Sequence, residues 1–261
     1  MPDLSVVVLT WNSLRHIDLC VRKTLEDVSR AGCSCEFFVV DNGSTDGTAE
    51  RVRELAAVHP QIVPIFLESN RGTTVPRNLA LRRATGELIC VLDSDAYPRP
   101  GCLSTLRDVL RDPKTGIAVP RLEYPDGRYQ KSVDVFPTLG RKLRRALFLR
   151  AMESRESQPP EGPVDYAISA FWMFRHELLE TVGLLDEKIF YAPEDVDFCL
   201  RVWKAGYTVR YVPRAVAVHD AQEKSRRILP NRLTRLHLAG LVYYFRKHGY
   251  VFRPPRQAGR R

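Results

Sequence analysis

The sequence predicts an α/β fold with a mainly parallel, Rossmann-like sheet flanked by helices. Two observations support this prediction. Runs of β-branched and other apolar residues alternate with segments whose apolar residues recur at helical spacing. Three polar turns follow predicted strands. Such alternation is typical of parallel sheets, which bind ligands at the carboxyl ends of their strands.

The first half of the chain contains four predicted strands separated by three predicted helices. The strands are Leu4–Leu9, Phe37–Val40, Ile62–Leu67 and Leu88–Leu92. The helices are Leu14–Arg30, Asp46–Val58 and Val75–Ala84. In the second half we expect a helix from Glu194 to Ala205, a strand over Ala215–Val218 and an amphipathic helix over Arg232–Lys247.

The composition indicates a globular protein with a substantial core. The chain has 261 residues, of which 44% are hydrophobic and 27% charged. No apolar stretch approaches the roughly 18 to 20 residues that cross a bilayer, and no secretory signal is visible. The six cysteines are scattered, which favours small buried hydrophobes over a disulfide framework. We therefore expect a cytoplasmic location.

The net charge of +9 is concentrated in two regions, Arg141–Arg155 and Arg226–Arg261. A basic face can meet nucleic acid, anionic lipid or a phosphorylated substrate, or it can simply be solvated. We expect no nucleic acid, because no recognised module or stacking platform is present. The segment Arg141–Arg150 suits an interfacial helix at the inner membrane surface or a lid. The C-terminal helix suits packing against the rest of the chain or membrane contact.

The strand Leu88–Leu92 leads directly into Asp93-Ser94-Asp95. Two acids at the end of a buried strand are either turn residues or ligands for a positive group. Polar turns also follow the first and second strands, at Thr10–Asn12 and Asp41–Gly47. Because the carboxyl ends of parallel strands meet at one edge, we expect these three turns to converge on one crevice.

These segments resemble family 2 glycosyltransferases of the GT-A fold. The nucleotide-side resemblance rests on Val7–Asn12, Val39–Thr48, Asn70–Gly72 with Asn78, and Gly86-Glu87 ahead of Asp93–Asp95. Ser169–Arg175, Val182–Glu187 and Glu194–Arg201 are similar to the acceptor-side motifs, most of all those of rhamnosyltransferase-like members. The resemblance extends from Leu4 to about His219.

The resemblance implies a GT-A catalytic domain over residues 1–222. Its nucleotide-binding half would cover 1–97 and its smaller acceptor-side half 98–222, with a basic helix and tail over 223–261. The implied donor-binding residues are Thr10, Trp11, Asn12, Asp41, Asn42, Arg71, Asp93, Ser94 and Asp95. Thr10 and Trp11 would flank the base, which Trp11 can stack on as the family's usual Tyr does. Thr73–Arg77 departs from the small, apolar residues common in relatives.

The resemblance also implies a divalent cation, Mn²⁺ or Mg²⁺. Two carboxylates beside a diphosphate would otherwise repel it, at a cost of about 4 kcal/mol for a unit pair 4 Å apart at an effective dielectric near 20. In the family pattern Asp95 binds the metal directly, whereas Asp93 lies nearer the ribose and reaches the metal through water. His219 would complete the ligand set, with a preference for Mn²⁺.

The second acidic cluster opens the helix Glu194–Ala205. Asp197 and Arg201 are four residues apart and suit a simple ion pair, which leaves Glu194 and Asp195 at the helix start. The family's inverting base corresponds to Asp195, and Glu194 would orient the acceptor. Acids in a first helical turn also serve as ordinary dipole partners.

Trp172 and Ala170 are candidates for the acceptor or sugar pocket, with core packing as the alternative for the aromatic ring.

The predicted function is an inverting, metal-dependent glycosyltransferase of the hexosyltransferase type. It would move a sugar from a UDP- or dTDP-sugar, with dTDP-rhamnose suggested by the most similar members, to a hydroxyl of a glycan, lipid-linked or small-molecule acceptor. A sugar nucleotidyltransferase is the alternative enzyme, but Thr10-Trp11-Asn12 is not the glycine-rich phosphate loop that it needs. A non-catalytic basic module for nucleic acid or membranes has no use for the clustered acids.

Overall fold

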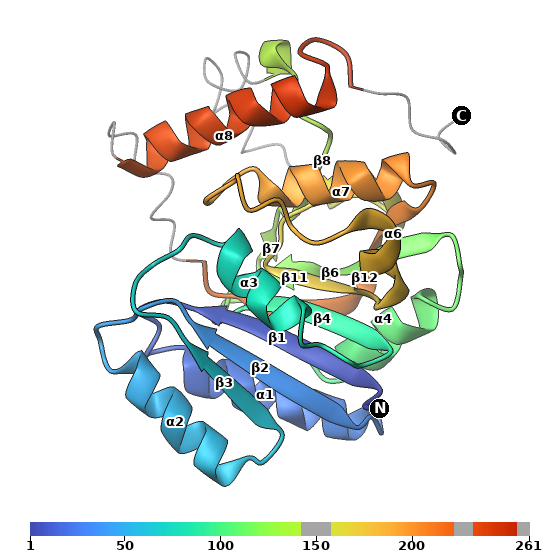
Figure 1. Ribbon diagram of the computed structural model, residues 1–261. Coiled ribbons are helices and arrows are strands. Elements are labelled where there is room, and N and C mark those ends of the chain that lie inside the picture. Colours follow the sequence, from blue (N-terminus) through green and yellow to red (C-terminus); the bar gives the residue numbers. More distant parts are fainter. Residues whose placement is uncertain (142–157, 222–231, 255–261) are drawn as a thin grey trace.

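The computed structural model describes residues 1–141, 158–221 and 232–254. Among these residues, the centre is a ten-stranded sheet (Figure 1). Its main path runs β3-β2-β1-β4-β11-β6-β12-β5, with β7 paired to β6 and β9 paired to β12. The strands of this sheet are β1 (Leu4–Thr10), β2 (Cys35–Asp41), β3 (Ile62–Phe66), β4 (Leu88–Asp93), β5 (Ala96–Pro98), β6 (Thr115–Glu123), β7 (Tyr129–Gln130), β9 (Gly162–Val164), β11 (Phe171–Arg175) and β12 (Thr208–His219). Strands β8 (Val133–Asp134) and β10 (Tyr166–Ala167) form a small separate pair.

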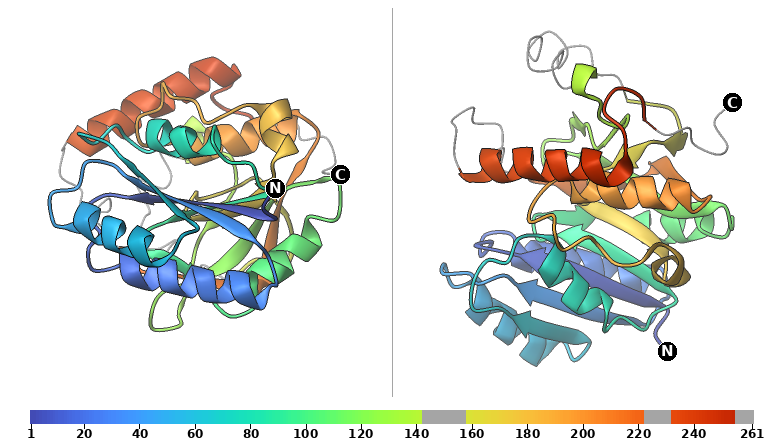
Figure 2. Two further views of the ribbon diagram at one scale, coloured as in Figure 1. Left: turned by 60° about the horizontal axis from the view of Figure 1, so that its bottom comes forward. Right: turned by 45° about the horizontal axis from the view of Figure 1, so that its top comes forward.

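Helices cover both faces of the sheet. They are α1 (Ile17–Arg30), α2 (Thr48–Val58), α3 (Thr74–Leu81), α4 (Cys102–Val109), α6 (Glu177–Val182), α7 (Glu194–Lys204) and α8 (Arg232–His248). Helices α1, α2 and α4 pack on one face, and α3, α6 and α7 pack on the other (Figures 1 and 2). Helix α8 lies on the outer side of α7 (Figure 1).

Strand periodicity explains the two cores. In β1, Val6 and Val8 point toward α1, whereas Val7 and Leu9 belong to the core beneath α3 and α7. Because side chains alternate between faces, a strand buried on both sides reads as a continuous apolar run. This is why β1, β2 and β4 were recognisable in the sequence, whereas β3 is an edge strand of mostly half-buried apolar residues.

The predicted strands and helices of the first half are confirmed, with end shifts of up to three residues. Strands β3, β2, β1 and β4 are all parallel. The second half is mixed, because β11 runs antiparallel to both β4 and β6. Hydrophobic periodicity reports which faces of a strand are buried but not its direction. The mixed half is therefore a finding of the structure.

The predicted packing of the C-terminal helix against the rest of the chain is confirmed. On α8, Tyr244 is fully buried. His248 Nε2 lies 2.8 Å from the buried Asp197 Oδ1, and Tyr243 donates to Asp186 at 2.9 Å. Gly240 faces the chain just before α7, where a Cβ atom would come within 2.2 Å of the Ala192 carbonyl oxygen.

Two predicted features fall largely or wholly outside the described residues. They are the basic segment at 141–150, of which only the first residue is described, and the end of the tail at 255–261. The domain boundary at residue 222 stays a prediction. Within the described ranges, no helix has the length and apolar character needed to span a bilayer.

We expect Gly240→Ala to destabilise the protein. The added methyl group would meet backbone atoms of Ala192, so helix α8 must shift away from α7, at a cost of about 1–3 kcal/mol. Urea unfolding followed by circular dichroism measures this change. Gly140→Ala is the matched control, because a Cβ atom there has no neighbour within 4 Å among the described residues. Equal stability of the two variants would contradict the close approach.

Candidate functional site

The candidate site lies at the carboxyl ends of β1, β2 and β4. Thr10, the last residue of β1, stands opposite Asp41 at the end of β2. On the other side of β1, Leu9 stands opposite Asp93 at the end of β4. The register thus confirms that the three polar turns converge on one edge of the sheet.

One end of this edge carries unsatisfied polar atoms beside an exposed ring. Thr10 Oγ1 and Asp41 Oδ1 are buried and have no hydrogen-bond partner among the described residues. Trp11, the next residue along, is 52% exposed. Buried polar atoms normally find a partner, so an orphaned pair beside a free aromatic face suits a ligand with polar edges and a flat ring.

The two predicted asparagines brace the neighbouring loops. Asn42 is buried, and its amide nitrogen donates to the Gly72 carbonyl at 2.8 Å while its oxygen accepts from the Arg71 backbone N–H at 2.8 Å. Asn12 Oδ1 accepts from the Thr45 backbone N–H at 2.8 Å. The Arg71 side chain is exposed. These asparagines therefore hold the loops that border the crevice.

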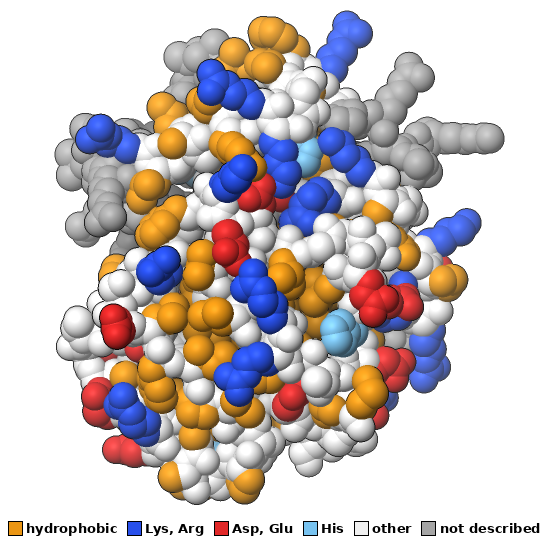
Figure 3. Space-filling model, viewed as in Figure 1, with side chains coloured by type: hydrophobic (Ala, Val, Ile, Leu, Met, Phe, Trp, Pro, Cys, Tyr) orange, Lys and Arg blue, Asp and Glu red, His pale blue; other side chains and the backbone are white. Residues whose placement is uncertain are grey.

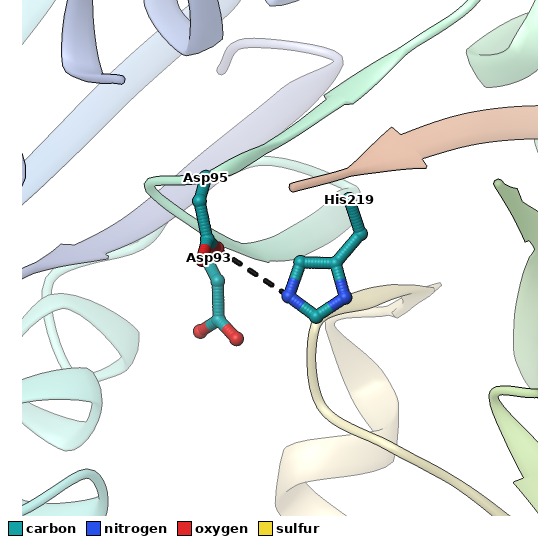
Figure 4. A group of neighbouring side chains, drawn as sticks. All are labelled: Asp93, Asp95 and His219. Carbon is teal, nitrogen blue, oxygen red and sulfur yellow. Dashed lines mark ion pairs between the residues drawn. The ribbon is translucent and has the colours of Figure 1, made fainter. Parts of the chain in front are cut away.

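The acid pair meets His219 at the ends of β4 and β12. Asp93, Asp95 and His219 each offer one ligand atom, and these three atoms lie within 4.8 Å of one another (Figure 4). His219 Nε2 is 3.4 Å from Asp95 Oδ1. Between the acids, Ser94 is buried and donates to Ser13 Oγ at 2.8 Å, which fixes the turn.

The charges in this cluster fit a divalent cation. Burial raises the pKa of the Asp93 carboxyl, with Arg77 opposing that rise and Asp95 adding to it. The pKa of the His219 imidazole is also raised, since the Asp95 and Asp93 carboxylates outweigh the opposing effect of burial. The site thus favours added positive charge. Two carboxylate oxygens and one imidazole nitrogen are ligands that Mn²⁺ accepts, and carboxylates also suit Mg²⁺.

Arg77 on α3 is a central residue that the sequence analysis did not identify as part of the site. Its side chain is 1% exposed, and its guanidinium donates to Asp93 Oδ1 at 2.5 Å and to Ser169 Oγ at 2.8 Å. A longer contact of 3.4 Å reaches Glu194 Oε1. Arg77 therefore joins the acid pair to the start of α7. The only sequence signal was a cation inside a segment expected to be small and apolar.

Glu194 and Asp195 at the start of α7 have different environments. Glu194 is buried and accepts from Ser169 Oγ at 3.1 Å. Burial and the adjacent Asp195 raise its pKa to about 8, despite the opposing effect of Arg77. Glu194 is therefore mostly protonated at neutral pH. Asp195 is only partly buried, so it is the better placed of the two to accept a proton from a bound molecule.

The expected pair Asp197–Arg201 is confirmed, with a distance of 2.9 Å. Asp197 also pairs with the side chains of His248 and Lys247 on α8, and it lies only two residues after Asp195. These contacts, led in effect by the His248 hydrogen bond, hold the pKa of Asp197 at about 2 against the effect of burial. The start of α7 is thus held by Arg77 from within and by α8 from outside.

Trp172 does not reach the surface of the crevice. It is 1% exposed, stacks on Phe198 of α7 and donates its indole N–H to the Ala167 carbonyl at 3.2 Å. An aromatic ring on a strand covered by a helix is a core residue, so the alternative of core packing describes its position better than the pocket role. Ala170 is also buried, but its carbonyl accepts from the Asp93 backbone N–H at 3.2 Å, directly beside the acid pair.

Comparison with known proteins identifies the family. The family described as "Glycosyl transferase family 2" matches residues 5–183. The chain is 26% identical to N-acetylglucosaminyl-diphospho-decaprenol L-rhamnosyltransferase of Mycobacterium tuberculosis, over 97% of this chain and 87% of that protein. It is 30% identical to the pre-mycofactocin glycosyltransferase of the same organism, over 72% of this chain but only 38% of that protein.

Solved structures share the fold. The mannosyltransferase PcManGT from Pyrobaculum calidifontis, in complex with GDP-Man and Mn²⁺, aligns with a TM-score of 0.62 and 24% identity, over 97% of this chain and 66% of that one. GalNAc-T7 with UDP, GalNAc and Mn²⁺ aligns with a TM-score of 0.71 and 15% identity, over 94% of this chain and 48% of that one. At these identities the likeness establishes the GT-A fold.

We expect Arg77→Met to cost about 3–5 kcal/mol of unfolding free energy, because it removes the buried cation that pairs with the Asp93 carboxylate. Adding Glu194→Gln should change the stability little further, since the pKa of Glu194 is raised to about 8 and its carboxyl is already mostly protonated at neutral pH. Urea unfolding of the single and double variants measures both effects.

The control is Arg82→Met, which breaks the exposed Arg82–Glu187 pair just after the end of α3. Such surface pairs contribute about 0–1 kcal/mol. If Arg77→Met and Arg82→Met lose similar stability, the buried cation does not have the role assigned to it.

Proposed function

This chain belongs to glycosyltransferase family 2, and we propose that it transfers a sugar with inversion from a nucleotide-diphosphate donor to an acceptor hydroxyl. One observation carries this proposal. Three potential metal ligands, Asp93, Asp95 and His219, meet at the same strand edge as the Thr10 and Asp41 oxygens, which have no partner in the described part of the chain. A nucleotide diphosphate with a divalent cation presents what these residues can bind: a cation for the three ligands and polar groups for the two oxygens.

The donor base is proposed to occupy the corner formed by Thr10, Trp11 and Asp41. The exposed Trp11 ring offers a stacking face, and the buried Asp41 oxygen can accept an N–H from the edge of a pyrimidine. Uracil and thymine both present such a donor, so a UDP- or dTDP-sugar fits this corner. The similarity to a rhamnosyltransferase supports dTDP-rhamnose as the first donor to test.

The cation is proposed to be Mn²⁺ or Mg²⁺, with Asp95 and His219 as its principal ligands. Bound there, it would neutralise charge on the departing diphosphate. Asp93 is the poorer direct ligand, because its Oδ1 already receives the Arg77 guanidinium. This difference supports a role for Asp93 near the ribose, or as a ligand that reaches the cation through a water molecule.

The chemical step requires no covalent intermediate. The acceptor oxygen forms a bond to the anomeric carbon, the bond from that carbon to the diphosphate oxygen breaks, and the hydroxyl proton passes to the Asp195 carboxylate. The raised pKa of Glu194 makes it a poor base at neutral pH but a good hydrogen-bond donor. Glu194 is therefore proposed to orient the acceptor.

The acceptor is proposed to be a glycan, lipid-linked or small-molecule hydroxyl. A lipid-linked acceptor, as named for the rhamnosyltransferase relative, would bring the chain to a membrane surface, and α8 supplies a suitable face. From Lys224 onward the sequence contains no Asp or Glu. Leu238 and Val242 on α8 are 60% and 50% exposed, between the exposed Arg235 and Arg246. Basic and hydrophobic side chains gather over α8 in Figure 3, a combination that favours anionic lipid.

Donor binding is tested first by thermal shift with UDP-, dTDP- and GDP-sugars, each with Mn²⁺ or Mg²⁺. A ligand at 100 times its dissociation constant adds about 2.7 kcal/mol of stability. We expect the UDP- or dTDP-sugar to raise the melting temperature of the parent, and Asp95→Asn to abolish most of that rise. If no donor shifts the parent protein, the proposed function fails.

The role of the base is tested by kinetics. Asp195→Asn should lower kcat by about 10²–10⁴ while the donor-induced thermal shift persists, because general-base catalysis contributes at this scale and the change does not touch the donor corner. Glu194→Gln keeps the hydrogen-bonding shape of the side chain and should lose much less activity. A larger loss in Glu194→Gln than in Asp195→Asn would reverse the assignment.

Membrane contact is tested by co-sedimentation with vesicles of phosphatidylcholine alone or with about one third phosphatidylglycerol. We expect binding to the anionic vesicles, weakened severalfold by Leu238→Glu, since each charge near the surface changes the energy by about 1 kcal/mol. Val58→Glu is the matched control, because Val58 is 73% exposed on α2, at the opposite end of the molecule (Figure 1). Equal loss in both variants would rule out α8 as the contact.

A further inference from the structure

We propose that Gln130 is a positioning residue of the metal site, which holds His219 in the tautomer whose Nε2 lone pair faces the cation. The inference rests on the proposed metal-dependent function. Gln130 lies on β7 and is 5% exposed, and its side chain contacts the side chain and the backbone of His219 together. No sequence motif pointed to this residue.

The two contacts fix the orientation of the Gln130 amide. Its nitrogen lies 3.4 Å from the His219 carbonyl oxygen, which can only accept a hydrogen bond. The opposite orientation would set two oxygen acceptors against each other. The amide oxygen therefore faces His219 Nδ1, at 2.7 Å.

The orientation of the amide in turn fixes the imidazole. An amide oxygen has no hydrogen to give, so His219 Nδ1 must carry the proton in this contact. In the neutral ring the lone pair is then on Nε2. That nitrogen lies on the side of Asp95, 3.4 Å from its Oδ1, where the three potential metal ligands converge (Figure 4).

The backbone makes this arrangement rigid. Strand β7 pairs with β6 at Leu122 and Gln130, and β6 pairs in turn with β12, which ends at His219. The sheet thus places Gln130 beside His219, although the two residues are 89 positions apart in the sequence. Loss of the amide would leave Nδ1–H without its acceptor in a buried setting, and the ring could turn or change tautomer.

The other tautomer would be unsuitable for metal binding. It carries a proton on Nε2, which would occupy the lone pair required by the cation and donate to Asp95 instead. Partners that orient metal-binding histidines in this way commonly contribute 10–100-fold to metal affinity. We expect Gln130 to contribute on this scale without touching the donor or the metal.

The experiment measures Mn²⁺ binding directly, through the loss of the electron paramagnetic resonance signal of free Mn²⁺, with and without UDP. Gln130→Met keeps the length of the side chain but has no comparable acceptor, and its dissociation constant for Mn²⁺ should rise by about 10–100-fold. Gln130→Glu keeps an acceptor for Nδ1–H while losing the longer contact to the His219 carbonyl, and it should bind within a few-fold of the parent.

Ser132→Ala is the matched control. Ser132 is buried two residues beyond Gln130, and its Oγ has no hydrogen-bond partner among the described residues. This change alters packing near the same strand but leaves His219 untouched, so Mn²⁺ affinity should not change. Thermal melting of all variants establishes that they are folded.

The tautomer is read independently by long-range ¹H–¹⁵N correlation spectra of the metal-free protein labelled at histidine, at alkaline pH, where imidazoles are neutral. The His219 ring should be protonated at Nδ1 in the parent and in Gln130→Glu, but not uniformly so in Gln130→Met.

Three outcomes would overturn the inference. The first is an unchanged Mn²⁺ affinity in folded Gln130→Met, and the second is a parent His219 protonated at Nε2. The third is a parent that binds no Mn²⁺ with or without UDP, which would also remove the proposed metal dependence. The first two outcomes leave the proposed transfer reaction intact.

Discussion

The site depends on one buried cation, the guanidinium of Arg77. A buried charge costs several kcal/mol unless it is paired and hydrogen-bonded, and Arg77 meets this condition only where Asp93, Ser169 and Glu194 come together. These partners lie on β4, just before β11 and at the start of α7. The nucleotide-side edge and the acceptor-side helix are therefore joined by an interaction that tolerates little separation between them.

Helix α8 completes this constraint from the other side. Lys247 and His248 meet Asp197 one turn into α7, while Gly240 lets the helix backbone approach Ala192. The start of α7 is thus held between the buried Arg77 guanidinium and a packed helix. A carboxylate that must meet an acceptor hydroxyl in one geometry benefits from such support, because a base works only within hydrogen-bond reach. The packing of α7 is in this way linked to the proposed catalytic role of Asp195.

The sequence predicted the parts of this fold that depend on local patterns. Strands buried on both faces and polar turns at their ends are visible as apolar runs followed by Thr10, Asp41 and Asp93. Long-range pairings were not visible. Arg77 finds Ser169 and Glu194 at separations of 92 and 117 residues, and nothing local marks it as their partner. The antiparallel direction of β11 was missed for the same reason, since burial patterns carry no direction.

The same ion pair explains why the two acids of the turn are not equivalent. Both carboxylates lie at the end of β4, but Arg77 already neutralises Asp93, whereas Asp95 faces His219 at 3.4 Å. A cation placed at the cluster gains most from the carboxylate that has no guanidinium beside it, because the attraction of Asp93 is partly cancelled by Arg77. Arg77 thus has two roles: it contacts the start of α7, and in the proposed metal site it would direct the cation toward Asp95 and His219.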